Sequence, residues 1–238
     1  MQRYFGNITN GVAYLSEDDL FHITKVMRAK KGDRIEVVSD DEPYLCEVEG
    51  LRPLSIRMIS KINENHELKN DIVLVAALIK GDKMDWVVQK ATELGVEEIV
   101  FLKTERTIVK INNADKDVKL ARYRKIIKEA SEQSKRTRQP LLYQVISMQE
   151  LSKIRADVKM IAYEGVSGDC SSFNNELKKI KRGSRVAIMV GPEGGFSQAE
   201  VQLAMANGYK QISLGKRILR AETASIYALS VIGNYLEK

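Results

Sequence analysis

Two glycine-rich turns constrain the fold of this chain more than any other feature. The first, residues 191–197 with the sequence GPEGGFS, follows the unbroken apolar run VAIMV at residues 186–190. The second begins at Leu214-Gly215, after a shorter run that starts at Ile212. An unbroken apolar run is typical of a strand that is buried on both faces of a sheet. Since ligands of open α/β sheets bind beyond the carboxyl ends of the strands, the two turns predict a binding crevice there.

Helical patterns follow both turns. Ser197 and Glu200 have the spacing of a capping box, in which each side chain bonds a backbone N–H at the start of a helix. A second helix is predicted over residues 220–236. Glycine lets the backbone approach a ligand where a Cβ atom would block it, but each turn taken singly is better explained as an ordinary strand–helix connection. Neither turn has the Walker A or the G-x-G-x-x-G pattern, which argues against a nucleoside triphosphate or a dinucleotide.

The rest of the chain indicates two domains. Residues 72–79 form another unbroken apolar run within a strand predicted over residues 71–79. A helical pattern follows it up to Gly95, and the next strand is predicted over residues 96–102, which together predict a strand–helix–strand unit of a parallel sheet. Residues 34–38, 44–48 and 54–59 instead alternate between apolar and polar, as strands of a small barrel do. Ser16 is placed to cap a short helix beside them. The polar residues 63–70 are predicted to be the linker, so that the domains span residues 1–70 and 71–238.

Composition excludes several classes of protein. The chain has 238 residues, and its longest clean apolar run, residues 72–79, is far too short to span a bilayer. The N-terminal residues lack the apolar segment of a signal peptide. Cys46 and Cys170 stand alone, without metal-ligand or redox spacing, and are predicted to be buried side chains in a protein of the reducing cytoplasm. No metal site and no membrane partner are therefore expected.

The net charge of +6 is unevenly distributed. Residues 1–70 hold 10 Lys and Arg against 12 Asp and Glu, whereas residues 71–238 hold 28 against 20. This excess is compatible with a polyanionic partner, and equally with the lysine-rich surface of a soluble protein. Residues 116–138, with nine basic and three acidic residues, and the cluster around Lys25 and Arg28 are the most basic segments. Each is a candidate for phosphate contacts or an ordinary solvated surface.

Taken together, the two turns resemble a known family. Residues 191–197, Leu214-Gly215 and the segment ILRAETA at residues 218–224 are similar to the RsmE family of the SPOUT class, whose members methylate N3 of a uridine in small-subunit (16S) ribosomal RNA. Residues 80–84, 89–95 and 104–107 and the turn at residues 31–33 also resemble this family, so the likeness covers nearly the whole chain. It implies a homodimer in which a PUA-like, RNA-binding β-barrel precedes a trefoil-knotted, parallel-sheet α/β methyltransferase domain that binds S-adenosylmethionine (SAM).

The resemblance also implies the site residues. Arg220 is the candidate for stabilising the anionic uracil or a neighbouring phosphate, and Glu222 for accepting the proton or orienting Arg220. The same two side chains are equally a salt-bridged pair at the start of a helix. Glu164 is either a neighbour of the cofactor loops or a capping carboxylate. SAM is expected to contact mainly the backbone of Gly191, Glu193, Gly194, Leu214, Gly215, Ile218 and Leu219. The family pattern at residues 129–136 implies that Gln133, Ser134 and Arg136 face the RNA, and Arg106 is a further RNA contact. Independently of the resemblance, the basic cluster adds Lys25 and Arg28 as expected phosphate contacts.

Three functions remain open on the sequence alone. The first is the uridine-N3 methyltransferase, and the second is a SAM-dependent methyltransferase of the same fold with another RNA target, such as a ribose 2′-oxygen or another base. The third is an RNA-binding or assembly protein without catalytic activity. The two complete turns argue against the third, because degraded cofactor loops would be expected there. The match beyond the turns argues against the second.

Overall fold

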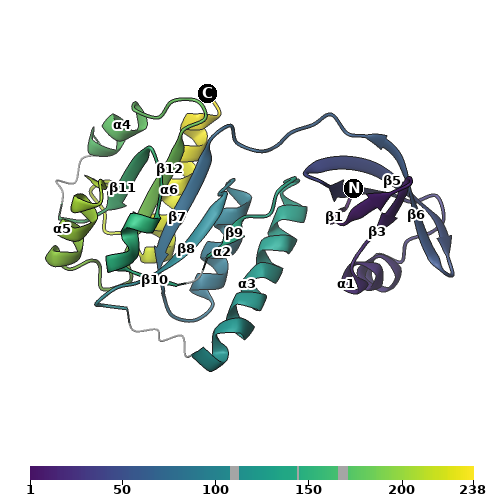
Figure 1. The fold of residues 1–238 in the computed structure, drawn as a ribbon, viewed down its shortest axis with the longest axis horizontal. Helices are drawn as coiled ribbons and strands as arrows, with labels where there is room; N and C mark the ends of the chain where they lie inside the picture. The colour runs from purple at the N-terminus through teal and green to yellow at the C-terminus, as the bar shows by residue number, and fades with distance from the viewer. Residues whose placement is uncertain (108–112, 144, 166–170) are drawn as a thin grey trace. The chain divides into compact units, whose positions relative to one another are not determined.

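The computed structural model describes residues 1–107, 113–143, 145–165 and 171–238 (Figure 1). Within these residues the chain forms two compact units. Unit 1 comprises Met1–Glu67 and Lys128–Arg138, and unit 2 comprises Leu68–Ile127 and Gln139–Lys238. Cys46 lies in the core of unit 1, where burial raises the pKa of its thiol to about 11, whereas Cys170 lies outside the described residues.

Unit 1 is a small β structure with a short helical segment. Its sheet has the order β1-β4-β5-β6-β3-β2. The strands are β1 (Arg3–Phe5), β2 (Asn7–Thr9), β3 (Val12–Tyr14), β4 (Arg34–Ser39), β5 (Glu42–Leu51) and β6 (Leu54–Lys61). Alternate residues such as Ile35, Val37 and Val48 point into the core, which confirms the three strands predicted from alternation. The strands of the first 14 residues were missed, because three residues are too few to show a period.

Ser16 caps helix α1 (Glu17–Phe21) as predicted, since its hydroxyl accepts a hydrogen bond from the backbone N–H of Asp19. The helix continues into a π-helical turn, η1 (His22–Val26), which ends before the left-handed backbone of Arg28. These segments place the predicted basic cluster on the surface of unit 1.

Unit 2 is an α/β structure. The described strands of its sheet follow the order β10-β8-β7-β12-β11-β13, with β9 beside β8, and every pairing is parallel. The strands are β7 (Asp71–Ala77), β8 (Glu98–Lys103), β9 (Leu141–Leu142), β10 (Ile146–Ser147), β11 (Val158–Ala162), β12 (Arg185–Val190) and β13 (Lys210–Ile212). The helices are α2 (Lys83–Glu93), α3 (Asn113–Gln133), α4 (Ser171–Leu177), α5 (Gln198–Ala206) and α6 (Ala221–Leu236), together with the 3₁₀ helix η2 (Met148–Lys153).

Helices cover both faces of this sheet. Residues such as Ile72 and Leu74 of β7 pack on one side with α2, α4 and α6, whereas Val73 and Val75 pack on the other side with η2 and α5. Because successive strand residues face opposite sides, a strand covered on both sides must be apolar throughout. The unbroken apolar runs therefore predicted the parallel sheet correctly. The trefoil knot stays a prediction.

The C-terminal end of α3 and the residues after it belong to a different unit from the one expected. The sequence boundary assigned residues 71–238 to one domain, but Lys128–Arg138 packs within unit 1. There the ammonium of Lys128 pairs with Asp19 and, at 2.8 Å, with Glu132. Asp19 and Lys128 are far apart in the chain, so their ion pair leaves no local pattern in the sequence. The amphipathic pattern of α3 therefore did not predict that its end packs within unit 1.

Candidate functional site

A cavity of about 470 Å³ lies at the carboxyl ends of three neighbouring strands of unit 2, β12, β11 and β13. The chain segments that follow these strands supply nearly all of its lining. The lining residues are Ala162, Tyr163, Glu164, Val190, Gly191, Pro192, Glu193, Gly195, Phe196, Ser213, Leu214, Gly215, Lys216, Arg217, Ile218, Leu219, Arg220, Ala221 and Ala224. The two glycine-rich turns, separated by α5 and β13 in the chain, therefore form one crevice, as the sequence predicted.

The first turn needs glycine at two of its positions. A Cβ atom on Gly191 would lie 3.1 Å from the ring of Phe196, which is tighter than ordinary packing allows. Gly195 has a φ of +66°, and a Cβ atom there would lie 3.2 Å from the carboxylate of Glu164. Glu164 itself is exposed and lines the cavity. Glycine thus keeps the backbone close to the cavity, where a larger residue would displace the wall.

The turn is also held from outside by the segment after β8. The capping box is present as predicted, because Glu200 accepts a hydrogen bond from the backbone N–H of Ser197 at 2.9 Å. The other carboxylate oxygen of Glu200 accepts the backbone N–H of Glu105 at 2.7 Å. Arg106 then donates from Nη1 to the carbonyl oxygen of Gly194 at 2.8 Å. Gly194 does not line the cavity, and its carbonyl oxygen is the point at which Arg106 supports the turn from outside.

The second turn brings a cation to the same cavity. Gly215 has a φ of +116°, and its N–H donates to the hydroxyl of Ser213 at 3.2 Å. Strand β13 ends at Ile212, two residues earlier than the apolar run suggested. Arg220 is the N-cap of α6, and its exposed side chain lines the cavity.

Glu222 occupies a different position from the one expected. It is 8 % exposed and does not line the cavity, and in the described part of the chain its ion pair is with Lys83 of α2, at 3.4 Å. Its other carboxylate oxygen is buried without a hydrogen-bond partner among the described residues. An orphan acceptor costs about 1–3 kcal/mol. Lys83 was given no role from the sequence, although it falls in the segment at residues 80–84 that resembles the family.

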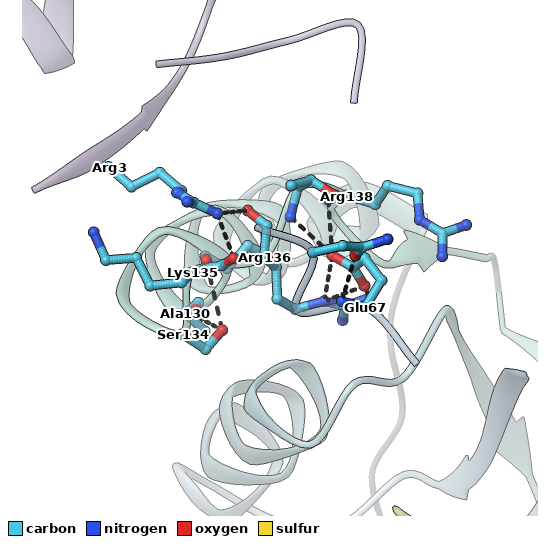
Figure 2. Close-up of polar contacts among 10 residues, drawn as sticks. Arg3, Glu67, Ala130, Ser134, Lys135, Arg136 and Arg138 are labelled. Atoms are coloured by element: carbon cyan, nitrogen blue, oxygen red, sulfur yellow. Dashed lines mark hydrogen bonds and ion pairs between the residues drawn. The ribbon is translucent and has the colours of Figure 1, made fainter. Parts of the chain in front are cut away.

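The expected RNA contacts differ in accessibility. Lys25 and Arg28, on and just after η1, are exposed, and so is Arg106. Gln133 at the end of α3 is exposed as well. The hydroxyl of Ser134 donates to the carbonyl oxygen of Ala130 at 2.7 Å and is thereby occupied (Figure 2).

Arg136 does not have the position expected of an RNA contact. It is only 2 % exposed, and Figure 2 shows its guanidinium directed at the carboxylate of Glu67, with Nη2 and Oε2 2.7 Å apart. The same carboxylate accepts the backbone N–H groups of Thr137 and Arg138 at 2.8 and 3.1 Å. On the other side of the segment, Arg3 donates to the carbonyl oxygens of Lys135 and Arg136. The arginine therefore has a structural role within unit 1.

Glu67→Gln is expected to lower the free energy of unfolding by about 3–5 kcal/mol, because it breaks the buried ion pair between this carboxylate and the guanidinium of Arg136. Burial alone would raise the pKa of Glu67, but the ion pair and hydrogen bonds with Arg136 and the two backbone donors hold it below its ordinary value of 4.5. A carboxyl with a lowered pKa stabilises the folded state fully above the unfolded value and loses that contribution as the pH falls through the folded value. Urea unfolding below pH 4.5 should therefore show a stability loss in the wild type that is smaller in Glu67→Gln.

The matched control is Glu49→Gln, which removes the partner of Arg57 from a pair that is 65 % exposed at Arg57 and 39 % at Glu49. Exposed pairs contribute about 0–1 kcal/mol, so this variant should unfold nearly as the wild type does. Equal losses in the two variants would contradict the structural role of Glu67.

No described group of three or more His, Cys, Asp or Glu side chains is arranged to hold a metal ion. No helix in the described ranges combines the length and the apolar character needed to cross a membrane.

Comparisons with known proteins agree with this architecture. A family model described as an RNA methyltransferase domain matches residues 66–233, and one described as an RNA methyltransferase PUA domain matches residues 15–57. Ribosomal RNA small subunit methyltransferase E of Bacillus subtilis is 36 % identical, over 100 % of this chain and 98 % of its own.

Two solved structures are similar over almost the full chain. A putative methyltransferase of Legionella pneumophila, in complex with SAM, has a TM-score of 0.88 and 31 % identity over 98 % of this chain and 97 % of its own. The ribosomal RNA small subunit methyltransferase E of Neisseria gonorrhoeae, bound to S-adenosyl methionine, has a TM-score of 0.85 and 27 % identity over the same shares. With both domain models matched in order and relatives aligned end to end, this chain belongs to the ribosomal RNA small subunit methyltransferase E family.

Proposed function

We propose that this protein transfers the methyl group of SAM to N3 of a uridine in 16S ribosomal RNA. The observation that carries the proposal is the cavity at the ends of β12, β11 and β13, which is built from the same two turns that resemble the family. Family membership supports the reaction class, and the SAM-bound relatives support the cofactor.

The residues of the cavity fit SAM. A volume of about 470 Å³ is within the range of roughly 300–1,000 Å³ usual for small-molecule sites. Leu214, Leu219 and Ala224 offer apolar surface for an adenine ring, and the glycine turns offer backbone N–H and C=O groups. Gly191, Glu193, Gly215 and Ile218 complete the expected set, while Gly194 contributes to the turn behind them. When bound, SAM supplies a methyl group on a sulfonium centre that reacts with nucleophiles.

The chain must make uracil N3 nucleophilic. N3 carries a proton at neutral pH, so the site needs a group that takes the proton and a cation that stabilises the anion that forms. Arg220 is exposed at the cavity and carries a permanent charge, so we assign it the second task. Glu222 lies in the first turn of the same helix, two residues after Arg220, and we assign its buried carboxylate, held by Lys83, to orient the helix start or to receive the proton.

The RNA must present the uridine with its Watson–Crick edge free, because N3 lies on that edge. An unpaired or flipped base satisfies this requirement. We assign RNA contacts to Lys25 and Arg28 of unit 1, as the PUA-like domain, and to Arg106 and Gln133, all of which are exposed. Ser134 is a weaker candidate, since its hydroxyl is already bonded.

We infer a homodimer that works in the cytoplasm, where ribosomes are assembled. Trp86 of α2 and Tyr227 of α6 are 46 % and 38 % exposed, and a second copy would cover such apolar surface. Light scattering after size exclusion tests the dimer, and a monomer at micromolar concentration would exclude it.

The test of function uses small ribosomal subunits from cells that lack this protein. Incubation with the wild-type protein and labelled SAM, followed by nucleoside analysis, should place the label in 3-methyluridine. Label in another nucleoside would keep the fold and cofactor but replace the target. No label and no SAM binding by calorimetry would leave a non-catalytic RNA-binding protein.

A further inference from the structure

A second cavity lies at the opposite edge of the same sheet. Its volume is about 380 Å³, and it is lined at the amino ends of β11 and β13 and by the turn that leads into β12. Four of its nine lining residues are lysines, namely Lys159, Lys179, Lys181 and Lys210. Nothing in the mechanism proposed above uses this cavity.

The charges that line this second cavity do not cancel. The lining carboxylates are Asp157 and Glu176, which leaves two positive charges in excess. Glu176 pairs with Lys179 at 2.6 Å, and Asp157 accepts the backbone N–H of Arg185 at 2.8 Å, so both acids are engaged. Among the described residues, Lys181 and Lys210 have no carboxylate partner. Like charges gathered around one hollow repel one another, and an anion bound there removes that repulsion.

The third unmatched lysine is held in place. Lys159 is partly buried, its ammonium donates to the carbonyl oxygen of Asn207 at 3.3 Å, and it lies 5.6 Å from the centre of the Tyr209 ring. Burial lowers the pKa of this lysine. Because the ammonium of Lys159 is held at the cavity wall by a carbonyl oxygen and an aromatic ring and not by a carboxylate, its positive charge is not neutralised by a neighbouring acid.

The rim is rigid as well as basic. Asn70 is 6 % exposed and donates from its amide to the carbonyl oxygens of Lys181 and Ser184 at 2.7 and 2.9 Å. The hydroxyl of Ser184 accepts the backbone N–H of Lys181 at 3.1 Å, which closes the turn. The backbone that carries Lys181 is thus fixed before any ligand arrives.

We propose that this second cavity binds backbone phosphates of the RNA substrate, away from the reacting base; this rests on the function proposed above. The same strands β11, β12 and β13 end at the SAM cavity and begin at the basic one. A five-residue strand such as β11 spans about 16 Å, so an RNA segment flanking the target reaches both edges. Contacts of this kind position RNA without reading its sequence.

The test compares Lys181→Gln/Lys210→Gln with the control Lys178→Gln/Lys238→Gln, which removes two exposed lysines outside the cavity. Binding to the unmethylated small subunits is measured across salt concentrations for both variants and the wild type. The first variant should bind about tenfold or more weakly at 0.1 M salt, with the slope of log affinity against log salt reduced by about two. SAM affinity by calorimetry should be unchanged in both variants.

Equal slopes for the two variants would overturn the phosphate site while leaving the methyl transfer of the wild type intact. Failure of methyl transfer is observed separately, in the wild-type protein, and would overturn the proposed function. Inorganic phosphate is titrated as a further probe. If it binds the wild type and not the first variant while subunit binding is equal in both, the cavity serves a free anion and the RNA proposal is wrong.

Discussion

Arg220→Ala is expected to lower the rate of methyl transfer by about 10²- to 10³-fold, the usual cost of removing a group that stabilises developing negative charge. The residue is exposed at the cavity and is the N-cap of α6, so its loss changes neither the core nor a capping hydrogen bond of its side chain. The measurement is label in 3-methyluridine under saturating SAM. SAM binding by calorimetry should persist, which separates the chemical step from cofactor binding.

Two further variants make this result specific. Arg220→Lys keeps the charge but loses the planar, two-pronged donor, so its rate should lie between those of the wild type and Arg220→Ala. Arg155→Ala removes an exposed arginine that lines neither cavity and should transfer methyl groups at the wild-type rate. Wild-type activity in Arg220→Ala would remove Arg220 from the mechanism.

Gly215→Ala is expected to weaken SAM binding tenfold or more. At a φ of +116° an L-residue is strained by about 1–3 kcal/mol, and the turn escapes the strain by moving away from the geometry that forms the cavity. A distortion of 1.4 kcal/mol in the bound state already corresponds to a factor of ten in affinity. Calorimetric titration with SAM measures the effect directly.

Gly11→Ala is the matched control for this strain. Gly11 has a φ of +77° in the turn between β2 and β3, with no atom within 4 Å of an added Cβ. Gly11→Ala should lower thermal stability by about as much as Gly215→Ala does, because the backbone strain is similar. Its affinity for SAM should equal that of the wild type. Wild-type SAM affinity in Gly215→Ala would show that the second turn takes no part in the cofactor site.

Much of unit 2 was predictable because a strand covered on both faces appears in the sequence as an unbroken run of apolar residues. The runs at residues 72–79 and 186–190 stay apolar without alternation, and Ser197 and Glu200 are close enough in the chain to form their capping box locally. The turns that follow β12 and β13 were brought together as expected, since parallel strands end at the same edge.

The individual roles were harder to predict, because they depend on neighbours far away in the chain. Arg136 carries the same charge in the sequence whether it faces RNA or Glu67, and only the folded chain shows it buried on Glu67. Glu222 was paired with Arg220 on proximity, but α2 packs against α6 and brings Lys83 to it instead.

The sequence by itself therefore determined the strand and helix pattern of the parallel sheet, the place of the glycine turns and the family resemblance, all of which are encoded in residues close together in the chain. The tertiary structure alone decided which charges are buried, which are paired and which are open, including the unmatched lysines at the amino edge of the sheet. The physical reason is that the state of a charged side chain depends on desolvation and on partners within a few ångströms, and packing supplies both.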